Sequence, residues 1–193
     1  MVSQPAYIAN LKEYARRRMK DYETEGAELI ENYNNESDRG TIILAATNIE
    51  DILEMKITDK LPALAGDETA RKKIFDHDGL ISSFSKRIEM AYAMGIIDKA
   101  YRKKIDLIRE MRNACAHARF PLSMEKQVLQ DASKALLMAT WDDLKDHEPV
   151  TLRNAFLMEC TFIGHYILTG DKIEGYEAQM RHYHELKASG VIT

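Results

Sequence analysis

The feature that most constrains the fold of this chain is its shortage of residues that interrupt helices. Only four prolines and nine glycines occur in 193 residues, and long stretches between them are rich in alanine, leucine, methionine, glutamate, lysine and arginine. These residue types have the highest helix propensities, and no strand-like alternation continues beyond a few residues. The sequence therefore predicts an all-α fold, a compact multi-helix bundle of about seven or eight helices with short connections.

Turn-forming residues divide the chain into predicted helices. The first begins after Pro5 and runs towards Tyr33, with Gly26 as a weak point, and the polar segment 34–38 ends it. We expect the others from Arg39 to about Pro62, over 70–75, from Ser82 or Ser83 to Gly95, from Asp98 to about Phe120, from Ser123 to Trp141, from Thr151 to about Leu168, and from Ile173 to Lys187. The whole chain, 1–193, is predicted to be one helical domain with 171–193 as a C-terminal helical appendage on the surface or against a partner.

Apolar residues recur every three or four positions in the central helices, which predicts buried faces there. The predicted core residues are Ile49, Ile52 and Leu53, with the stretch 41–46 leading into them, and Phe84, Ile88, Ala91, Tyr92, Ile105, Ile108, Met111, Cys115, Val128, Leu129, Ala132, Leu136 and Ala139. Cys115 and Cys160 are the only cysteines and are flanked by apolar residues, so we expect two buried free thiols rather than a disulfide or a zinc site.

Charge and hydropathy exclude several classes of protein. The net charge of −4 and the pI near 5.9 argue against binding of nucleic acid through the overall electrostatic field. The local exception is the basic cluster of Arg16, Arg17, Arg18 and Lys20, which could contact RNA or DNA phosphates, although a solvated helix face is the more common use of such a cluster. No run of about 20 apolar residues and no signal peptide are present, which predicts a cytoplasmic protein without a membrane span.

Cofactor and metal motifs are also missing from the sequence. We find no glycine-rich phosphate loop, nucleophile elbow or His-Glu-x-x-His helix, and we predict no cofactor. The run Asp76-His77-Asp78 has the composition of a metal site, but beside Gly79 it is more typical of a turn. His182 and His184 lie two positions apart, on different sides of a helix, so we predict no metal site there.

One short segment carries a chemical signal: Arg112, Asn113 and His117 combine a permanent cation, an amide and a group that titrates near neutral pH. Together they could cleave RNA without metal, His117 transferring the proton and Arg112 stabilising the phosphorane while Asn113 orients one of them. On an ideal helix, however, the two charged residues are rotated by roughly 140° and separated by roughly 7.5 Å. Cleavage would need a helix that loosens near His117 or a homodimer that joins two motifs.

The alternative is a structural network in which these side chains bond to neighbouring carbonyls and carboxylates. Glu50, Asp51 and Glu54 are then expected to supply a carboxylate facing Arg112. The residues alone leave both interpretations open.

Several blocks of the sequence resemble the mannitol operon repressor family of helical bacterial regulators. These blocks are residues 39–46, 75–88, 91–97 and 107–113, and the most distinctive is the Asp-Gly-x-x-x-Ser-Phe-Ser stretch that begins at Asp78. The resemblance covers about residues 38–120. It implies an all-helical regulator that acts through protein partners, because neither the family pattern nor this chain shows a helix-turn-helix.

The Arg-Asn-x-x-Ala-His ending at His117 is similar to the signature of the HEPN superfamily. Active members of that superfamily are dimeric, metal-independent endoribonucleases, and inactive members are binding modules. This resemblance implies Arg112, Asn113 and His117 as the catalytic set. We therefore expect a regulatory or interaction protein, dimeric and with a protein partner or RNA as its ligand, with a HEPN-type ribonuclease as the alternative.

Overall fold

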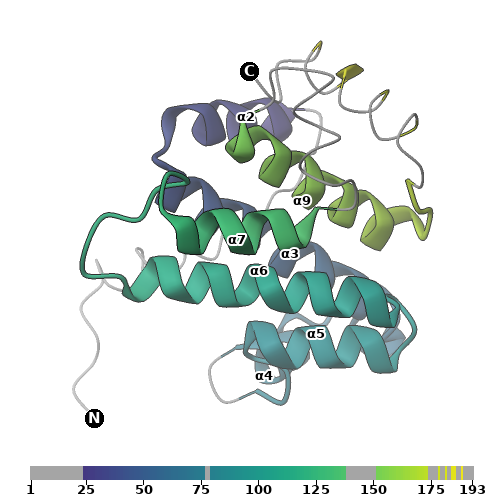
Figure 1. Cartoon of the computed structure of the whole chain (residues 1–193). Helices are drawn as coiled ribbons and strands as arrows, with labels where there is room; N and C mark the ends of the chain where they lie inside the picture. Colours follow the sequence, from purple (N-terminus) through teal and green to yellow (C-terminus); the bar gives the residue numbers. More distant parts are fainter. Residues whose placement is uncertain are drawn as a thin grey trace.

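The computed structural model describes residues 24–76, 79–137 and 151–173, together with Ala178, Arg181, His184, Glu185 and Ala188. All the regular structure in these residues is helical, which confirms the predicted all-α fold (Figure 1). The elements are α2 (Thr24–Asn35), α3 (Asp38–Asp59), the 3₁₀ helix η1 (Pro62–Leu64), α4 (Glu68–Phe75), α5 (Phe84–Ala93), α6 (Lys99–His117), α7 (Gln127–Leu136) and α9 (Leu152–Thr169).

Local capping chemistry sets the ends of these helices. Ser83, Asp98 and Thr151 accept hydrogen bonds from backbone amides in the first turns of α5, α6 and α9, as the sequence predicted. Ser37 and Asp67 do the same for α3 and α4. Gly95 and Gly170 follow the last turns of α5 and α9 with φ values of 70° and 81°, a left-handed conformation that glycine adopts without strain.

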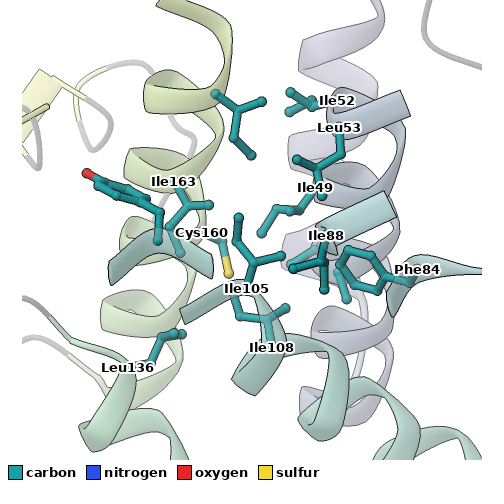
Figure 2. Close-up of a cluster of buried hydrophobic side chains, with 14 of the residues drawn as sticks. Ile49, Ile52, Leu53, Phe84, Ile88, Ile105, Ile108, Leu136, Cys160 and Ile163 are labelled. Carbon is teal, nitrogen blue, oxygen red and sulfur yellow. The ribbon is translucent and has the colours of Figure 1, made fainter. Parts of the chain in front are cut away.

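Helix α3 is the centre of the packing and contacts α5, α6 and α9, while α6 lies between α5 and α7 (Figure 1). The core is made where these helices face one another. Figure 2 shows Ile49 and Leu53 of α3, Ile105 of α6 and Ile163 of α9 converging there. Helix α9 is buried on nearly all sides, yet none of the described helices is long and apolar enough to cross a membrane.

Most of the predicted core is confirmed, including both cysteines, which are buried and free. The prediction that Tyr92 and Val128 lie in the core was wrong, because both side chains are exposed. The Tyr92 ring lies on the surface of α5 beneath the guanidinium of Arg102, 4.8 Å from its centre. Val128 stands in the first turn of α7, where Leu129 takes the inward position instead.

Three predicted helix boundaries need correction. Helix α7 begins at Gln127 rather than Ser123, because Ser123 starts a turn in which its carbonyl accepts from the Lys126 amide, 3.0 Å. The same helix ends at Leu136 rather than Trp141, since Leu137 is extended. Ile173 is not helical, so the last helix does not begin there. Most of residues 174–193, His182 among them, lie outside the described part of the chain. The same holds for Ala139, Trp141, the start of the first predicted helix and the cluster from Arg16 to Lys20.

The glycine of the most distinctive sequence block, Gly79, lies in the turn after α4, and the geometry of this turn requires it. The Gly79 amide donates to the carbonyl of Asp76, 2.8 Å, which agrees with the predicted turn, while His77 and Asp78 lie outside the described residues. A Cβ atom on Gly79 would stand 2.2 Å from the carbonyl oxygen of Ile74. Because backbone atoms occupy that space, only glycine fits, and the turn can deliver the chain into α5.

Two carboxylates are buried inside this helical core. Glu54 of α3 lies 3.1 Å from Arg71 of α4 and 3.1 Å from Arg87 of α5, and Arg87 also contacts Glu50 at 3.0 Å. Glu159 of α9 is paired with Lys104 of α6 at 2.6 Å. These ion pairs join α3 to α4 and α5, and α6 to α9, through charges that are largely removed from water.

Candidate functional site

The candidate site is the C-terminal end of α6, where the Arg-Asn-x-x-Ala-His segment lies. The rotation of this helix is fixed by its buried stripe, which ends with Met111 and Cys115. That stripe leaves Arg112 and Asn113 half-buried and His117 exposed as the last residue of the helix. The guanidinium of Arg112 donates to the side-chain oxygen of Asn113 at 3.1 Å. The structure therefore brings Arg112 and Asn113 together.

The structure does not bring Arg112 and His117 together within one chain. Helix α6 stays regular through His117, because the amide of Ala118 still donates to the carbonyl of Ala114 at 2.9 Å. The helix therefore does not loosen near His117, which was one of the two conditions for cleavage, and the two side chains keep the rotation of roughly 140° that a helix gives to residues five apart. Any cleavage that needs both groups on one phosphate requires a second copy of the chain.

Arg39, in the first turn of α3, holds the end of α6 in place. Its guanidinium donates to the carbonyl oxygens of Ala116 and Ala118, each at 3.2 Å. Carbonyls in the last turn of a helix lack intrahelical partners, and a cation is favourable near them. Because the two carbonyls lie on either side of His117, this contact fixes the backbone that presents the imidazole.

Asp38, the residue before Arg39, ties the loop that follows α6 to the same place. Its carboxylate accepts the amide of Met124 at 2.7 Å and pairs with Arg153 of α9 at 2.9 Å. Arg153 also donates to the carbonyl of Glu36, 2.7 Å away. The start of α3, the loop after α6 and the first turn of α9 therefore meet beside His117 in one network of charge-assisted hydrogen bonds.

The carboxylates expected to face Arg112 mainly serve other cations. Glu50 and Glu54 are bound by Arg87 and Arg71, and Arg112 acts on Glu50 only as a neighbouring charge. Burial raises the pKa of Glu50, and the positive charges of Arg87 and Arg112 oppose that rise. Glu50 thus lies close enough to Arg112 to act as a neighbouring counter-charge, as predicted, although its ion pair is with Arg87.

Burial also decides the chemistry of the thiol nearest this site. It raises the pKa of Cys115, and the positive charge of Arg39 opposes the rise only in part. Burial raises the pKa of Cys160 well above its usual range. Neither thiol is therefore a reactive thiolate at neutral pH.

An apolar hollow of about 400 Å³ adjoins the end of α6. It is formed by the loop from Ala118 to Leu122 and by the start of α7, with Arg119 and Lys126 among its lining residues. Phe120 is 81% exposed and Val128 is 68% exposed. We call these two side chains, together with Pro121, the Phe120 patch. Phe120 and Pro121 lie on the loop that the Asp38 and Arg39 contacts hold in position, and Val128 lies in the first turn of α7.

Sequence reasoning missed Asp38, Arg39 and Arg153 as parts of this site. They are distant from the motif in sequence, and a charged residue at a helix start has many ordinary uses, so no single-sequence signal could have connected them to His117. The exposed state of Phe120 could have been suspected, because it follows the last turn of α6 and precedes Pro121 in a short loop.

Among the described residues, no three histidine, cysteine, aspartate or glutamate side chains are grouped so that they could hold a metal ion. Comparison with known proteins gives no relative from which a function could be transferred: no family model, no curated protein and no solved structure matches this chain.

Proposed function

We propose that this chain is a helical regulatory protein of the kind that its resemblance to the mannitol operon repressor family implies, and that it acts by binding a partner protein through the Phe120 patch. The observation that carries the proposal is the exposure of Phe120 and Val128 beside an apolar hollow. Grouped apolar side chains on a surface are typical of protein interaction sites, and aromatic anchors contribute much of the binding energy there.

The surroundings of the patch support this assignment and describe the partner. The loop that carries Phe120 is already held by Arg39 at Ala118 and by Asp38 at Met124, so less conformational entropy is lost when it binds. Arg119 and Lys126 are the cationic residues that line the hollow among the described residues. A complementary partner therefore presents an apolar side chain flanked by carboxylates.

A second candidate function is metal-independent cleavage of RNA by Arg112, Asn113 and His117. It is favoured by the exposure of His117 at the end of α6 and by the Arg112–Asn113 hydrogen bond. Because Arg112 and His117 diverge on a regular helix, this function depends on the homodimer predicted from the sequence, with a second copy completing the site. We place both functions in the cytoplasm.

Complementation separates the two functions. In a strain from which the gene for this protein has been deleted, expression of the wild-type chain should restore the wild-type transcript profile, measured by RNA sequencing. We expect Phe120→Asp to fail, because a charge replaces the apolar anchor, and His117→Ala to succeed. Leu80→Asp is the matched control, since Leu80 is also 80% exposed and lies in the turn before α5.

The opposite pattern would reject the binding proposal. If His117→Ala fails while Phe120→Asp restores the profile, the imidazole rather than the patch carries the function. Equal failure of Phe120→Asp and Leu80→Asp would also count against it, because the effect would then not be specific to the patch. Circular dichroism of each purified variant confirms that it is folded.

A further inference from the structure

A second hollow, far in sequence from the α6 motif, runs along α3. It is a groove of about 690 Å³ whose described lining comes from α2, α3, η1, the start of α4 and the turn between the last two. Leu29, Leu44, Met55 and Leu64 supply apolar lining. Removal of apolar surface from water is favourable, so the groove is suited to an apolar ligand surface.

One face of α3 gives the groove its length. Among the lining residues, Leu44, Thr47, Asp51, Met55 and Asp59 recur at spacings of three and four, which places them on one side of the helix. This stripe is about 22 Å long, because each helical residue adds about 1.5 Å. Helices α5, α6 and α9 pack on other sides of α3. A compact small molecule would leave much of the stripe bare, whereas a docked helix follows all of it.

The charge along this stripe is negative. Asp51 and Asp59 lie eight positions apart on α3, about 12 Å along the helix, and Glu68 of α4 adds a further carboxylate to the lining. The cation among the described lining residues, Arg71, is already bound to Glu54 at 3.1 Å and to Glu68 at 3.0 Å. The groove therefore favours a ligand that carries its own positive charges.

Two further features of the stripe define the ligand. The hydroxyls of Thr47 and Thr58 donate to the carbonyls of Ile43 and Glu54 in the same helix, at 2.9 and 2.8 Å, so these hydrogens need no acceptor from a ligand. Asp59 is exposed and ends α3, where the helix dipole already places negative charge. A ligand cation beside Asp59 therefore interacts favourably with the carboxylate and with the end of the helix.

We propose that this groove binds an amphipathic helix of a partner protein, with its apolar residues on the groove lining and lysine or arginine side chains next to Asp51 and Asp59. Two cations seven or eight positions apart on such a helix match the separation of the two carboxylates. This site goes beyond the proposed function, because its partner is basic, whereas the Phe120 patch selects a partner with carboxylates. The chain then has two docking surfaces of opposite charge preference.

Binding of a labelled synthetic peptide to the full-length chain, measured by fluorescence anisotropy, tests the proposal. The probe is a leucine and lysine helix of about 18 residues, long enough to cover the stripe, with its leucines three and four positions apart. We expect saturable binding to the wild type and about tenfold weaker binding to Asp59→Lys, because a repulsive charge replaces an attractive one. A cation is favourable at the end of a helix, so this variant should remain folded, which circular dichroism verifies.

Two controls separate the groove from general attraction between the peptide and an acidic protein. Asp131→Lys makes the same change of charge at an exposed position of α7 and should weaken binding less than about twofold. A second peptide has the same composition, but its leucines are distributed around the helix. It should bind the wild type at least about tenfold more weakly, because it has no apolar face to cover the groove.

Three results would overturn the proposal. The first is absence of binding to the wild type, as expected if another part of this chain covers the groove. The second is equal weakening by Asp59→Lys and Asp131→Lys, or equal binding of the two peptides, because general attraction would then explain the binding. The third is conversion of a dimer into monomers by the peptide, measured by sedimentation velocity, because the groove would then hold a second copy. Binding that depends on Asp59 and on the leucine spacing, without a change in oligomeric state, supports the partner helix.

Discussion

Replacement of Arg87 by methionine is expected to lower the free energy of unfolding by about 3–5 kcal/mol. Arg87 is the cation between Glu50 and Glu54, and its guanidinium also donates to the carbonyls of Ile81 and Phe75, at 3.3 and 3.4 Å. Methionine preserves much of the apolar volume but leaves the half-buried carboxylate of Glu50 and the buried carboxylate of Glu54 short of a positive charge. Urea denaturation at pH 7 measures the loss.

The same variant should show a defined dependence on pH. Burial raises the pKa of Glu50 above 4.5, so the stabilisation from its protonated form is complete below about 4.5 and is lost as the pH rises through the raised value. Without Arg87 that pKa rises further, and the destabilisation should therefore be smaller at pH 4.5 than at pH 7. A destabilisation that does not depend on pH would contradict this explanation.

Arg102→Met is the matched control for charge removal. Arg102 pairs with Glu89 at 2.7 Å, but both side chains are exposed to solvent. Exposed ion pairs typically contribute about 0–1 kcal/mol, so this variant should lose little stability. If the two methionine variants were equally destabilised, burial of the Arg87 network would not be the cause. Adding Glu54→Gln to Arg87→Met should recover part of the loss.

Replacement of Phe156 by alanine is the second change for which we expect a loss of about 3–5 kcal/mol. Phe156 is fully buried in α9, a helix that packs against both α3 and α7. Removal of the ring leaves a cavity that the surrounding helices can fill only in part. Thermal and urea denaturation give the loss, and Phe156→Leu, which leaves a smaller cavity, provides an intermediate value if the alanine variant does not fold.

Phe120→Ala is the control for removal of a phenyl ring. Its side chain is exposed, so its removal should change the free energy of unfolding by less than about 0.5 kcal/mol. A large loss in Phe120→Ala would mean that the ring supports the fold, and it would remove the main argument for a binding patch. A loss below about 1 kcal/mol in Phe156→Ala would contradict the packing of α9 in the core.

The fold could be predicted from local signals because these signals agree with one another. Helix formers, caps such as Ser83 and Asp98, and the apolar spacing of Ile105, Ile108 and Met111 all specify the same helices. Prediction failed where a tertiary contact decides the outcome. Asp38 holds the amide of Met124 in the segment before α7, and nothing in the sequence near Ser123 reveals that contact.

The candidate site was predicted only in part for the same reason. The spacing of Arg112, Asn113 and His117 on one helix can be read directly from the sequence, and so can the problem of their divergence. The contacts of Arg39 with the end of α6 join residues that are 77 and 79 positions apart, and the pairing of Arg87 with Glu50 joins residues 37 apart. One sequence cannot show which of many charged residues meet across such distances.

We propose that the end of α6 binds a partner and does not cleave RNA, and incubation of the protein with RNA tests this directly. Purified wild-type chain and His117→Ala are each incubated with mixed RNA in the presence of EDTA, and the RNA is then examined for breaks and for the chemistry of its ends. We predict intact RNA in both incubations. Cleavage by the wild type alone, with cyclic phosphate ends, would contradict the claim and would establish His117 as a catalytic residue.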